Sequence, residues 1–492
     1  PGPARWMGEH VRAALEAGDL SLAALDDKVR RLLRTIDRAG AFERPDLAPE
    51  QSVDKPEHRR LIREVGGEAI VLLKNANDSL PLDRTRIRSI AVIGENARWT
   101  QPQGGGSVHV RPHYVVSPLD GIRNKVGDAV EVGYEIGCNI SRRLPLIEAD
   151  WLAAGDGAQK GLGVEYFTSL DLSGDPVHTE IVDHLDLVWF GKSVPGVDDN
   201  QFSARLTGHL TVPESGRYRL GLMSAGLGRL YVDGQKVIDN WAGMPLWGGP
   251  EKTVEIELVG GQAYLLQIEY RWEGGPDWRL LRLGCLPPAL VASLPDAMAL
   301  AARSDVAIVV VGLTEEWEHE GEDRADMELP GDQATLIEQV AAANPNTIVV
   351  VNTGSPITMN WLDRVAAVVQ VWYLGQEMGN AIADVLFGDV NPSGKLPTTF
   401  PVRLQDNPAY LNYPGENGEV LYGEGIFIGY RYYDAKGIEP LFPFGYGLSY
   451  TDFEYRDLVL DANEYMPGEN IRVSVDVGNT GICAGQEVVQ IY

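Results

Sequence analysis

The stretch Asp305-Val-Ala-Ile-Val-Val-Val311 is an apolar run, rich in β-branched residues, that follows a single Asp. Such a run predicts a strand that is buried on both faces of a parallel sheet. It continues directly into Gly312-Leu-Thr-Glu-Glu-Trp-Glu-His-Glu-Gly-Glu-Asp-Arg324, which carries six carboxylates, one His and one Arg. In open α/β sheets, ligands bind at the carboxyl ends of the strands. The sequence therefore predicts an α/β fold with a candidate site in this acidic segment.

The acidic segment has two interpretations. A carboxyl group beside an aromatic ring and an apolar wall has a raised pKa and can act as a general acid. The alternative is a solvated surface loop, which is the commoner meaning of an acidic run. Trp317 lies in the middle of the segment and favours the functional interpretation, because a loop that serves only solubility has no use for an indole.

Composition narrows the class of protein. The 492 residues predict about three domains, and a hydrophobic content of 44% provides ample core. The formal net charge of −28 argues against nucleic acid and anionic membranes as partners. Apolar runs are only strand-length, so no membrane-spanning helix is expected. The three cysteines are far apart and form no CxxC motif, so neither a disulfide framework nor a zinc site is indicated. These features fit a cytoplasmic or a secreted protein.

The pattern changes character twice along the chain. Residues 8–36 have helical periodicity with a break near Gly18, where Ser21 is a candidate N-cap, and residues 59–74 are expected to form another helix. Short alternating strands with Gly, Pro, Asp and Ser turns replace this pattern over 145–288 and predict an antiparallel β-sandwich or barrel. The α/β alternation resumes from 296. We therefore expect an all-β module inserted into one α/β domain.

The two ends suggest a piece of something larger. Pro1 follows no initiator Met, and residues 487–492 stop within an expected strand. The helices of residues 8–36 also lack a core that they could cover. We therefore expect the chain to be a fragment.

A glycine-rich segment, Gln103-Gly-Gly-Gly-Ser107, follows the short expected strand at 90–94. Glycines in such a loop allow close approach to a ligand. The spacing matches neither GxGxxG nor GxxxxGK, which disfavours phosphate binding. A plain flexible loop is the remaining alternative.

Several motifs in a fixed order make the whole chain resemble glycoside hydrolase family 3 β-glucosidases with an inserted protective-antigen-type domain. Those of the α/β part are Ala69-Ile-Val-Leu-Leu-Lys-Asn75, Gly104-Gly-Gly-Ser107, Val311-Gly-Leu313 with the acidic segment, Gly375-Gln-Glu-Met-Gly379, Ala383-Asp-Val-Leu-Phe-Gly-Asp389 and Phe442-Pro-Phe-Gly-Tyr-Gly-Leu-Ser-Tyr450. The insert adds Ser215-Gly-Arg-Tyr218, Gly228-Arg-Leu-Tyr-Val-Asp-Gly234 and Asp239-Asn-Trp241.

The resemblance implies a domain order. Residues 1–38 would be the last helices of a TIM-like barrel, and 39–57 a linker. An α/β sandwich with a mostly parallel sheet would occupy 58–144 and 289–405, split by an antiparallel β-sandwich at 145–288. A connecting segment at 406–450 would lead to the start of a fibronectin type III-like domain at 451–492.

The resemblance also implies retaining hydrolysis, in which two carboxyl groups about 5–5.5 Å apart flank the glycosidic bond. The nucleophilic Asp would lie in the barrel, outside these residues, so the isolated chain is expected to be inactive. Glu316 is the first candidate for the acid/base residue, followed by Glu318, Glu315 and Glu320. The expected substrate-binding residues are Trp317, Gly104, Gly105, Gly106 and Ser107, and this chemistry requires neither a metal nor a cofactor.

The expected partner is a carbohydrate or glycoside, with β-linked glucose released from short oligosaccharides or from aryl and small-molecule glucosides. An insert leaning over the site would favour such short substrates, with Trp247, Trp272 and Trp278 as candidates for stacking on the aglycone. A homo-oligomer is compatible with the sequence. Two alternatives stay open, a non-catalytic carbohydrate-binding protein and a related exo-glycosidase such as a β-xylosidase or N-acetylglucosaminidase.

Overall fold

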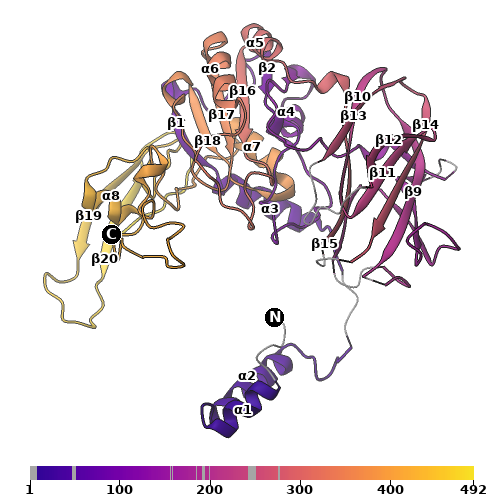
Figure 1. Ribbon diagram of the computed structural model, residues 1–492. Helices are drawn as coiled ribbons and strands as arrows, with labels where there is room; N and C mark the ends of the chain where they lie inside the picture. Colours follow the sequence, from indigo (N-terminus) through magenta and orange to yellow (C-terminus); the bar gives the residue numbers. More distant parts are fainter. Residues whose placement is uncertain are drawn as a thin grey trace. The chain divides into compact units, whose positions relative to one another are not determined.

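The computed structural model describes residues 8–46, 51–155, 157, 159–183, 185–190, 194–198, 200–241, 251–274 and 278–492 (Figure 1). The chain forms two compact units that divide between Lys55 and Pro56. None of the helices among the described residues is long and apolar enough to cross a membrane.

The first unit contains two helices, as the periodicity of residues 8–36 predicts. Helix α1 spans Glu9–Ala17 and helix α2 spans Leu22–Arg38. The Ser21 hydroxyl accepts a hydrogen bond from the Ala24 N–H at 3.1 Å, which confirms the expected N-cap. Neither helix buries a residue, and Leu22 and Leu32 stay exposed on α2.

The second unit is built on a six-stranded sheet in the order β1-β18-β17-β16-β2-β3. All neighbouring pairs are parallel except β1 with β18. The strands are β1 Val71–Asn75, β2 Ser89–Ile93, β3 Glu131–Glu135, β16 Val306–Gly312, β17 Thr347–Asn352 and β18 Ala367–Gln370. Every residue of β16 is buried, as expected of a central strand covered on both faces.

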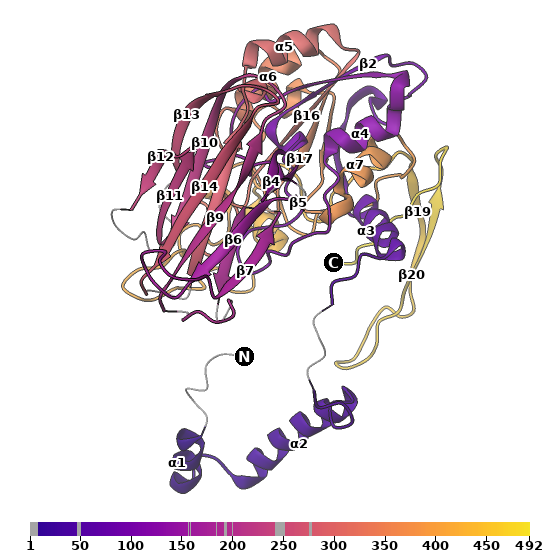
Figure 2. The same ribbon diagram turned by 90° about the vertical axis from the view of Figure 1, so that its right-hand side faces the viewer.

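Helices cover both faces of this sheet (Figures 1 and 2). They are α3 Pro56–Ala69, α4 Pro118–Val126, α5 Leu294–Arg303, α6 Gln333–Ala343 and α7 Met378–Leu386. Alternate residues of β2 enter different cores. Ile90 and Val92 pack with α4 and α7, whereas Ala91 and Ile93 pack with α5 and α6. The period-2 alternation of the strands thus divides the hydrophobic core into two layers.

The helix expected over 59–74 is wrong over its last five residues, 70–74. Helix α3 ends at Ala69, and Val71–Asn75 forms the edge strand β1. Leu72 faces one core layer, while Val71 and Leu73 face the other. Burial on both faces of the sheet stabilises the strand over a continued helix, which would bury only one stripe.

The all-β insert leaves the α/β part after β3 and returns before α5. Its pairs are all antiparallel, in a four-stranded sheet of order β13-β10-β15-β8 and an eight-stranded sheet centred on β11-β14-β9. The strands are β4 Leu152–Ala154, β5 Gln159–Lys160, β6 Leu162–Phe167, β7 His178–Val182, β8 Asp186–Phe190, β9 Phe202–Thr211, β10 Gly216–Ala225, β11 Leu227–Val232, β12 Gln235–Asn240, β13 Lys252–Leu258, β14 Ala263–Trp272 and β15 Trp278–Leu286. Side chains from both sheets, such as Leu220 and Leu266, share one core.

The chain after α7 runs back over the α/β part before its last strands. Leu448 pairs with Leu72 of β1, and Phe400 pairs with Phe442. A short helix, α8 Tyr430–Lys436, precedes the antiparallel pair β19 Phe453–Leu460 and β20 Val473–Asn479. The strand expected at 487–492 does not form. Gln490 instead donates a side-chain hydrogen bond to the Gly445 carbonyl, so this segment is held by a side chain and not by a backbone ladder.

Candidate functional site

Two loops meet at the carboxyl edge of the parallel sheet. The acidic loop, residues 313–324, follows β16, and the glycine loop, residues 103–107, lies in the connection after β2. The Gly105 N–H donates to the Glu318 carbonyl at 3.2 Å, and the Glu320 N–H donates to the Gly105 carbonyl at 3.4 Å. The sequence predicted a site at this edge, and the structure brings together the two segments that it singled out.

The glycines are needed because the loops pack tightly. A methyl group on Gly105 would lie 2.7 Å from Cβ of His319 and 2.8 Å from the Glu315 carbonyl oxygen. Gly106 has φ +89°, and a methyl group there would lie 2.7 Å from Cβ of Glu320. A methyl group on Gly104 would make only ordinary contact, 3.7 Å from the nearest atom of Val108. At Gly105 and Gly106, the glycine loop therefore packs too closely against the acidic loop to admit a larger residue.

Glu320 is the exposed carboxylate of this contact. Its Oε2 accepts a hydrogen bond from the Ser107 N–H at 2.9 Å and another from the Ser107 hydroxyl. The hydroxyl and the N–H of Ser107 hold the pKa of Glu320 below its ordinary value. The side chain is thus fixed in direction by the glycine loop while it remains open to solvent.

The Glu318 side chain binds residues at the sheet edge and not the partners of Glu315, Glu316 or Glu320. Its carboxylate accepts a hydrogen bond from the Gly354 N–H at 2.8 Å and others from the hydroxyls of Ser355 and Tyr373. Burial and the charge of Glu318 both raise the pKa of Tyr373. Both oxygens of Glu318 are therefore committed to donors after β17 and β18, which ties the acidic loop to the sheet edge.

Glu316 is largely buried, with 8% of its side chain exposed. Its Oε2 accepts from the Arg142 N–H at 2.7 Å, and its Oε1 lies 3.0 Å from Nε of Arg143, though not aligned as a hydrogen bond. Glu315 is more open, with 40% of its side chain exposed and its Oε2 3.4 Å from Nδ1 of His109.

Trp317 anchors the acidic loop to the segment that precedes the insert. Its indole N–H donates to the Ile140 carbonyl at 2.8 Å, and the guanidinium of Arg142 lies 3.8 Å from the centre of its ring. The Ile140 N–H in turn donates to Glu95 at 2.7 Å. At least one face of Trp317, predicted to bind substrate, is therefore occupied by a side chain of the same unit.

A cavity of about 840 Å³ lies between these loops and the insert. The glycine loop and the acidic loop form one wall with Arg142 and Arg143, and the insert adds the opposite wall. The apolar part of that wall consists of Val188, Met223 and Leu280. The lining is thus mainly polar and charged with one apolar wall, and is more polar than that of most small-molecule sites.

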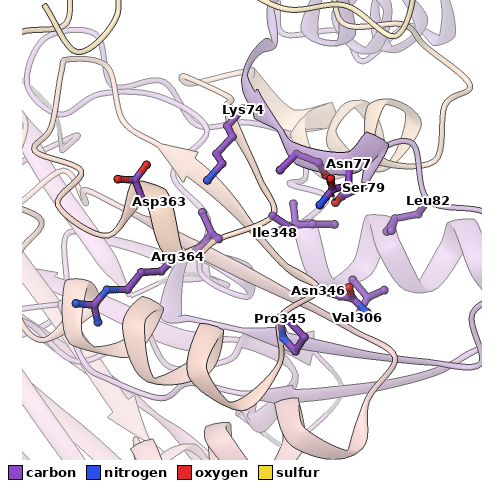
Figure 3. Close-up of a pocket in the computed structure, with 13 residues that line it drawn as sticks. Lys74, Asn77, Ser79, Leu82, Val306, Pro345, Asn346, Ile348, Asp363 and Arg364 are labelled. Atoms are coloured by element: carbon purple, nitrogen blue, oxygen red, sulfur yellow. Dashed lines mark hydrogen bonds between the residues drawn. The ribbon is translucent and has the colours of Figure 1, made fainter.

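A second hollow, of about 520 Å³, lies at the opposite edge of the sheet (Figure 3). It is bordered by the first residues of β16 and β17 and by Lys74, whose Nζ donates to the Leu362 carbonyl at 2.8 Å. Because ligand sites of such sheets form at the carboxyl ends of the strands, this hollow is the weaker candidate.

The tryptophans proposed for aglycone stacking have different outcomes. Trp272 is only 3% exposed and packs in the core of the insert, so it cannot reach a ligand. Trp247 and the side chain of Trp278 lie outside the described part of the chain. Within the described ranges, no group of three His, Cys, Asp or Glu side chains is arranged to hold a metal ion.

Among the residues of the cavity that were not expected from the sequence, three charged ones surround or approach Glu316. Arg142 and Arg143 contact Glu316, and Glu251 of the insert is a further buried carboxylate of the same cavity. Burial raises the pKa of Glu251, and the nearby charge of Glu316 raises it further. The only feature of the local sequence that could have indicated them is the Arg142-Arg143 pair directly before the insert. Their contacts join residues more than a hundred positions apart, which no local pattern encodes.

Comparison with known proteins gives consistent matches. A family model described as "Glycosyl hydrolase family 3 C-terminal domain" matches residues 70–430. A beta-glucosidase of Rhizobium radiobacter is 42% identical over all of this chain and 60% of its own length. A probable beta-glucosidase I of Aspergillus terreus is 38% identical over all of this chain and 61% of its own length.

Solved structures agree with these relatives. A beta-glucosidase from Kluyveromyces marxianus, crystallised in complex with glucose, superposes with a TM-score of 0.85 at 34% identity, covering 98% of this chain and 60% of that chain. A beta-glucosidase from Streptomyces venezuelae in complex with D-glucose gives a TM-score of 0.63 at 30% identity, covering 97% of this chain and 56% of that one. The chain thus spans about 60% of the length of the curated relatives described.

Proposed function

The chain belongs to glycosyl hydrolase family 3, and we propose that it supplies the acid/base half of a retaining β-glucosidase that releases glucose from short oligosaccharides or small glucosides. The observation that carries the proposal is the contact of the acidic loop with the glycine loop, which presents the Glu320 carboxylate to solvent at the carboxyl edge of the sheet. The names of the relatives support glucose as the released sugar.

The reaction needs two carboxyl groups about 5–5.5 Å apart. The nucleophile attacks the anomeric carbon and displaces the leaving group, to which the acid/base residue gives its proton. The same residue, now ionised, then takes a proton from the water that hydrolyses the glycosyl-enzyme. As the family resemblance implies, we place the nucleophile outside these 492 residues, and this chain contributes the acid/base residue.

Glu320 is our first candidate for that residue. An acid/base group must exchange its proton with the leaving oxygen and with water, so it must be reachable, and the exposure of Glu320 supports this role. Glu318 is fully committed to its donors, and Glu316 faces Arg142 and Arg143. Glu316, ranked first from the sequence, is therefore the second candidate, followed by Glu315.

Substrate on the acidic loop would bring Glu320 into a drier environment. Ser107 holds the pKa of Glu320 below its ordinary value in the open site. Exclusion of water by a bound sugar and by the domain that supplies the nucleophile would raise the pKa, because burial disfavours the charged form. A higher pKa would favour the protonated form of Glu320, which would take its proton from solvent as the site closes and then give it to the leaving oxygen.

The insert would close the aglycone side. We propose that it is the protective-antigen-type β-sandwich at 145–288, and that Val188, Met223 and Leu280 form the wall against which a short aglycone packs. A wall at this place would exclude long polymers. We retain the fibronectin type III-like identity of 451–492 and the barrel origin of 1–38 as parts of the same proposal.

The test is turnover of an aryl β-glucoside by two proteins. The chain joined to a family 3 barrel should hydrolyse it, whereas the isolated 492 residues should not. Turnover of an aryl β-xyloside or an aryl N-acetylglucosaminide by the joined protein tests the alternative of a related exo-glycosidase. Glucose binding without turnover in the joined protein would overturn the enzyme proposal and favour the non-catalytic carbohydrate-binding alternative.

A further inference from the structure

Residues 140–144, which join the α/β part to the insert, are held by three carboxylates. The N–H groups of Ile140, Arg142 and Leu144 donate to carboxylates of Glu95, Glu316 and Glu251 at 2.7, 2.7 and 2.6 Å. The segment is not a regular strand, because residues 142 and 143 form a bend and the Ser141 N–H also donates to Glu95, at 3.4 Å. The carboxylates thus pair with backbone donors of a bent segment that no strand or helix pairs. We call this arrangement the carboxylate clamp.

The three carboxylates come from three different parts of the fold. Glu95 follows the end of strand β2 after one intervening residue, Glu316 belongs to the acidic loop, and Glu251 directly precedes β13 of the insert. Hydrogen bonds from N–H groups to ionised acceptors are shorter and stronger than neutral ones. The segment therefore links the sheet edge, the candidate site and the insert through consecutive strong contacts.

The Glu251 side chain occupies a space between two strands of the insert. Gly221 of β10 and Gly284 of β15 are paired directly across the sheet. A methyl group on Gly221 would lie 2.5 Å from the Glu251 carboxyl carbon, and one on Gly284 would lie 2.8 Å from Oε1. Arg282 donates to the same Oε1 at 3.1 Å, and only 3% of the Glu251 side chain is exposed. The glycine pair thus leaves the space that the carboxylate fills.

The other side of the clamp is closed by the acidic loop. Arg143 lies 3.0 Å from Oε1 of Glu316, and Arg142 covers the ring of Trp317. The indole of Trp317 donates back to the Ile140 carbonyl. A displacement of the backbone at Leu144 would therefore reach the acidic loop, which carries Glu320, through the contacts of residues 140–143.

We infer that the carboxylate clamp fixes the insert against the acidic loop, and that Glu251 is a positioning residue that sets the width of the aglycone cavity. Glu251 acts through Leu144 and Arg142 and not on the reacting atoms. The structural part of this inference stands alone, whereas its effect on substrate rests on the proposed function.

Amide hydrogen exchange tests the structural part with the 492-residue chain. In Glu251→Ala, we expect exchange of the Ile140 and Arg142 amides to rise at least about tenfold, although their own acceptors are intact, because the clamp opens as one unit. Glu251→Gln retains an acceptor oxygen for Leu144 and should restore most of the protection. Glu257→Ala, in the exposed part of β13, is the matched control and should leave these amides unchanged.

An increase confined to the Leu144 amide would overturn the clamp, because the three carboxylates would then act independently. Faster exchange of the Ile140 and Arg142 amides in the Glu257→Ala control would also overturn it, since the effect would then reflect general loosening of the insert.

Kinetics of the chain joined to a family 3 barrel test the functional part. Glu251→Ala should raise KM for an aryl β-glucoside several-fold and leave kcat within about twofold, with Glu251→Gln close to the original. An unchanged KM in a variant whose amides are deprotected would overturn the positioning role. Absence of turnover in the unsubstituted protein would refute the proposed function, while the exchange result would still decide whether the clamp exists.

Discussion

Replacement of Gly106 by Ala should displace Glu320 while leaving the rest of the fold in place. The added methyl group would lie 2.7 Å from Cβ of Glu320, whereas ordinary contact begins at 3.4 Å, so one of the two must move by at least 0.7 Å (3.4 − 2.7). The backbone at Gly106 has φ +89°, which costs a residue with a Cβ about 1–2 kcal/mol. Overpacking adds about 1–3 kcal/mol.

The sum is a destabilisation of about 2–5 kcal/mol, part of which the acidic loop relieves by moving. Movement by about 1 Å near reacting groups reduces turnover on the order of a hundredfold. Gly104→Ala is the matched control in the same loop, because its methyl group would be no closer than 3.7 Å to another atom.

Exchange of the Ser107 amide measures the displacement directly, because this N–H donates to Glu320 at 2.9 Å. It should exchange at least about tenfold faster in Gly106→Ala and at the original rate in Gly104→Ala. Turnover of an aryl β-glucoside by the barrel-joined protein should fall in parallel. Equal rates of Ser107 amide exchange in the two variants would refute the close packing of Gly106 against Glu320.

Two further predictions concern the ion pairs and the aromatic anchor. Burial alone would raise the pKa of Asp384, but hydrogen bonds from Arg63 and Lys125 outweigh it and keep this pKa below its ordinary value. The folded state thus binds fewer protons than the unfolded state, so the stabilisation of about 3–5 kcal/mol over Asp384→Asn should be present at neutral pH and decline as pH falls below about 4. Urea titrations across pH check this, and a difference independent of pH would contradict it. Trp317→Phe removes the indole N–H bond to Ile140 and weakens the Arg142 contact, so unfolding should become about 1–2 kcal/mol easier. Unchanged stability would show that the indole does not anchor the acidic loop.

Much of the fold was predictable because its signals are local. The apolar run at 305–311 predicts strand β16, since a continuous β-branched stretch of that length is most stable when buried in a sheet. Ser21 before a periodic segment predicted the start of α2, and the insert was visible as a series of short alternating strands. The meeting of the acidic and glycine loops was predictable because both follow parallel strands, which end at one edge.

The remainder depends on contacts between distant residues. Val71–Asn75 became a strand because β18 lies beside it, which helical periodicity alone does not encode. The sequence ranked Glu316 above Glu320, but the relative exposure of the two carboxylates is set by Arg142 and Arg143, more than 170 positions away. Glu251 gave no signal, because the space that its side chain occupies is formed by two glycines on different strands.

The most direct test of the central claim is the dependence of kcat/KM on the leaving group in the barrel-joined protein. Removal of the general acid harms poor leaving groups most, because they need the proton. In Glu320→Ala, we expect a loss of at least about a hundredfold for an alkyl β-glucoside and a much smaller loss for an activated aryl β-glucoside. Glu316→Ala should reduce both substrates to a similar extent. The reverse pattern, with the selective loss in Glu316→Ala, would contradict the assignment of the proton donor to Glu320.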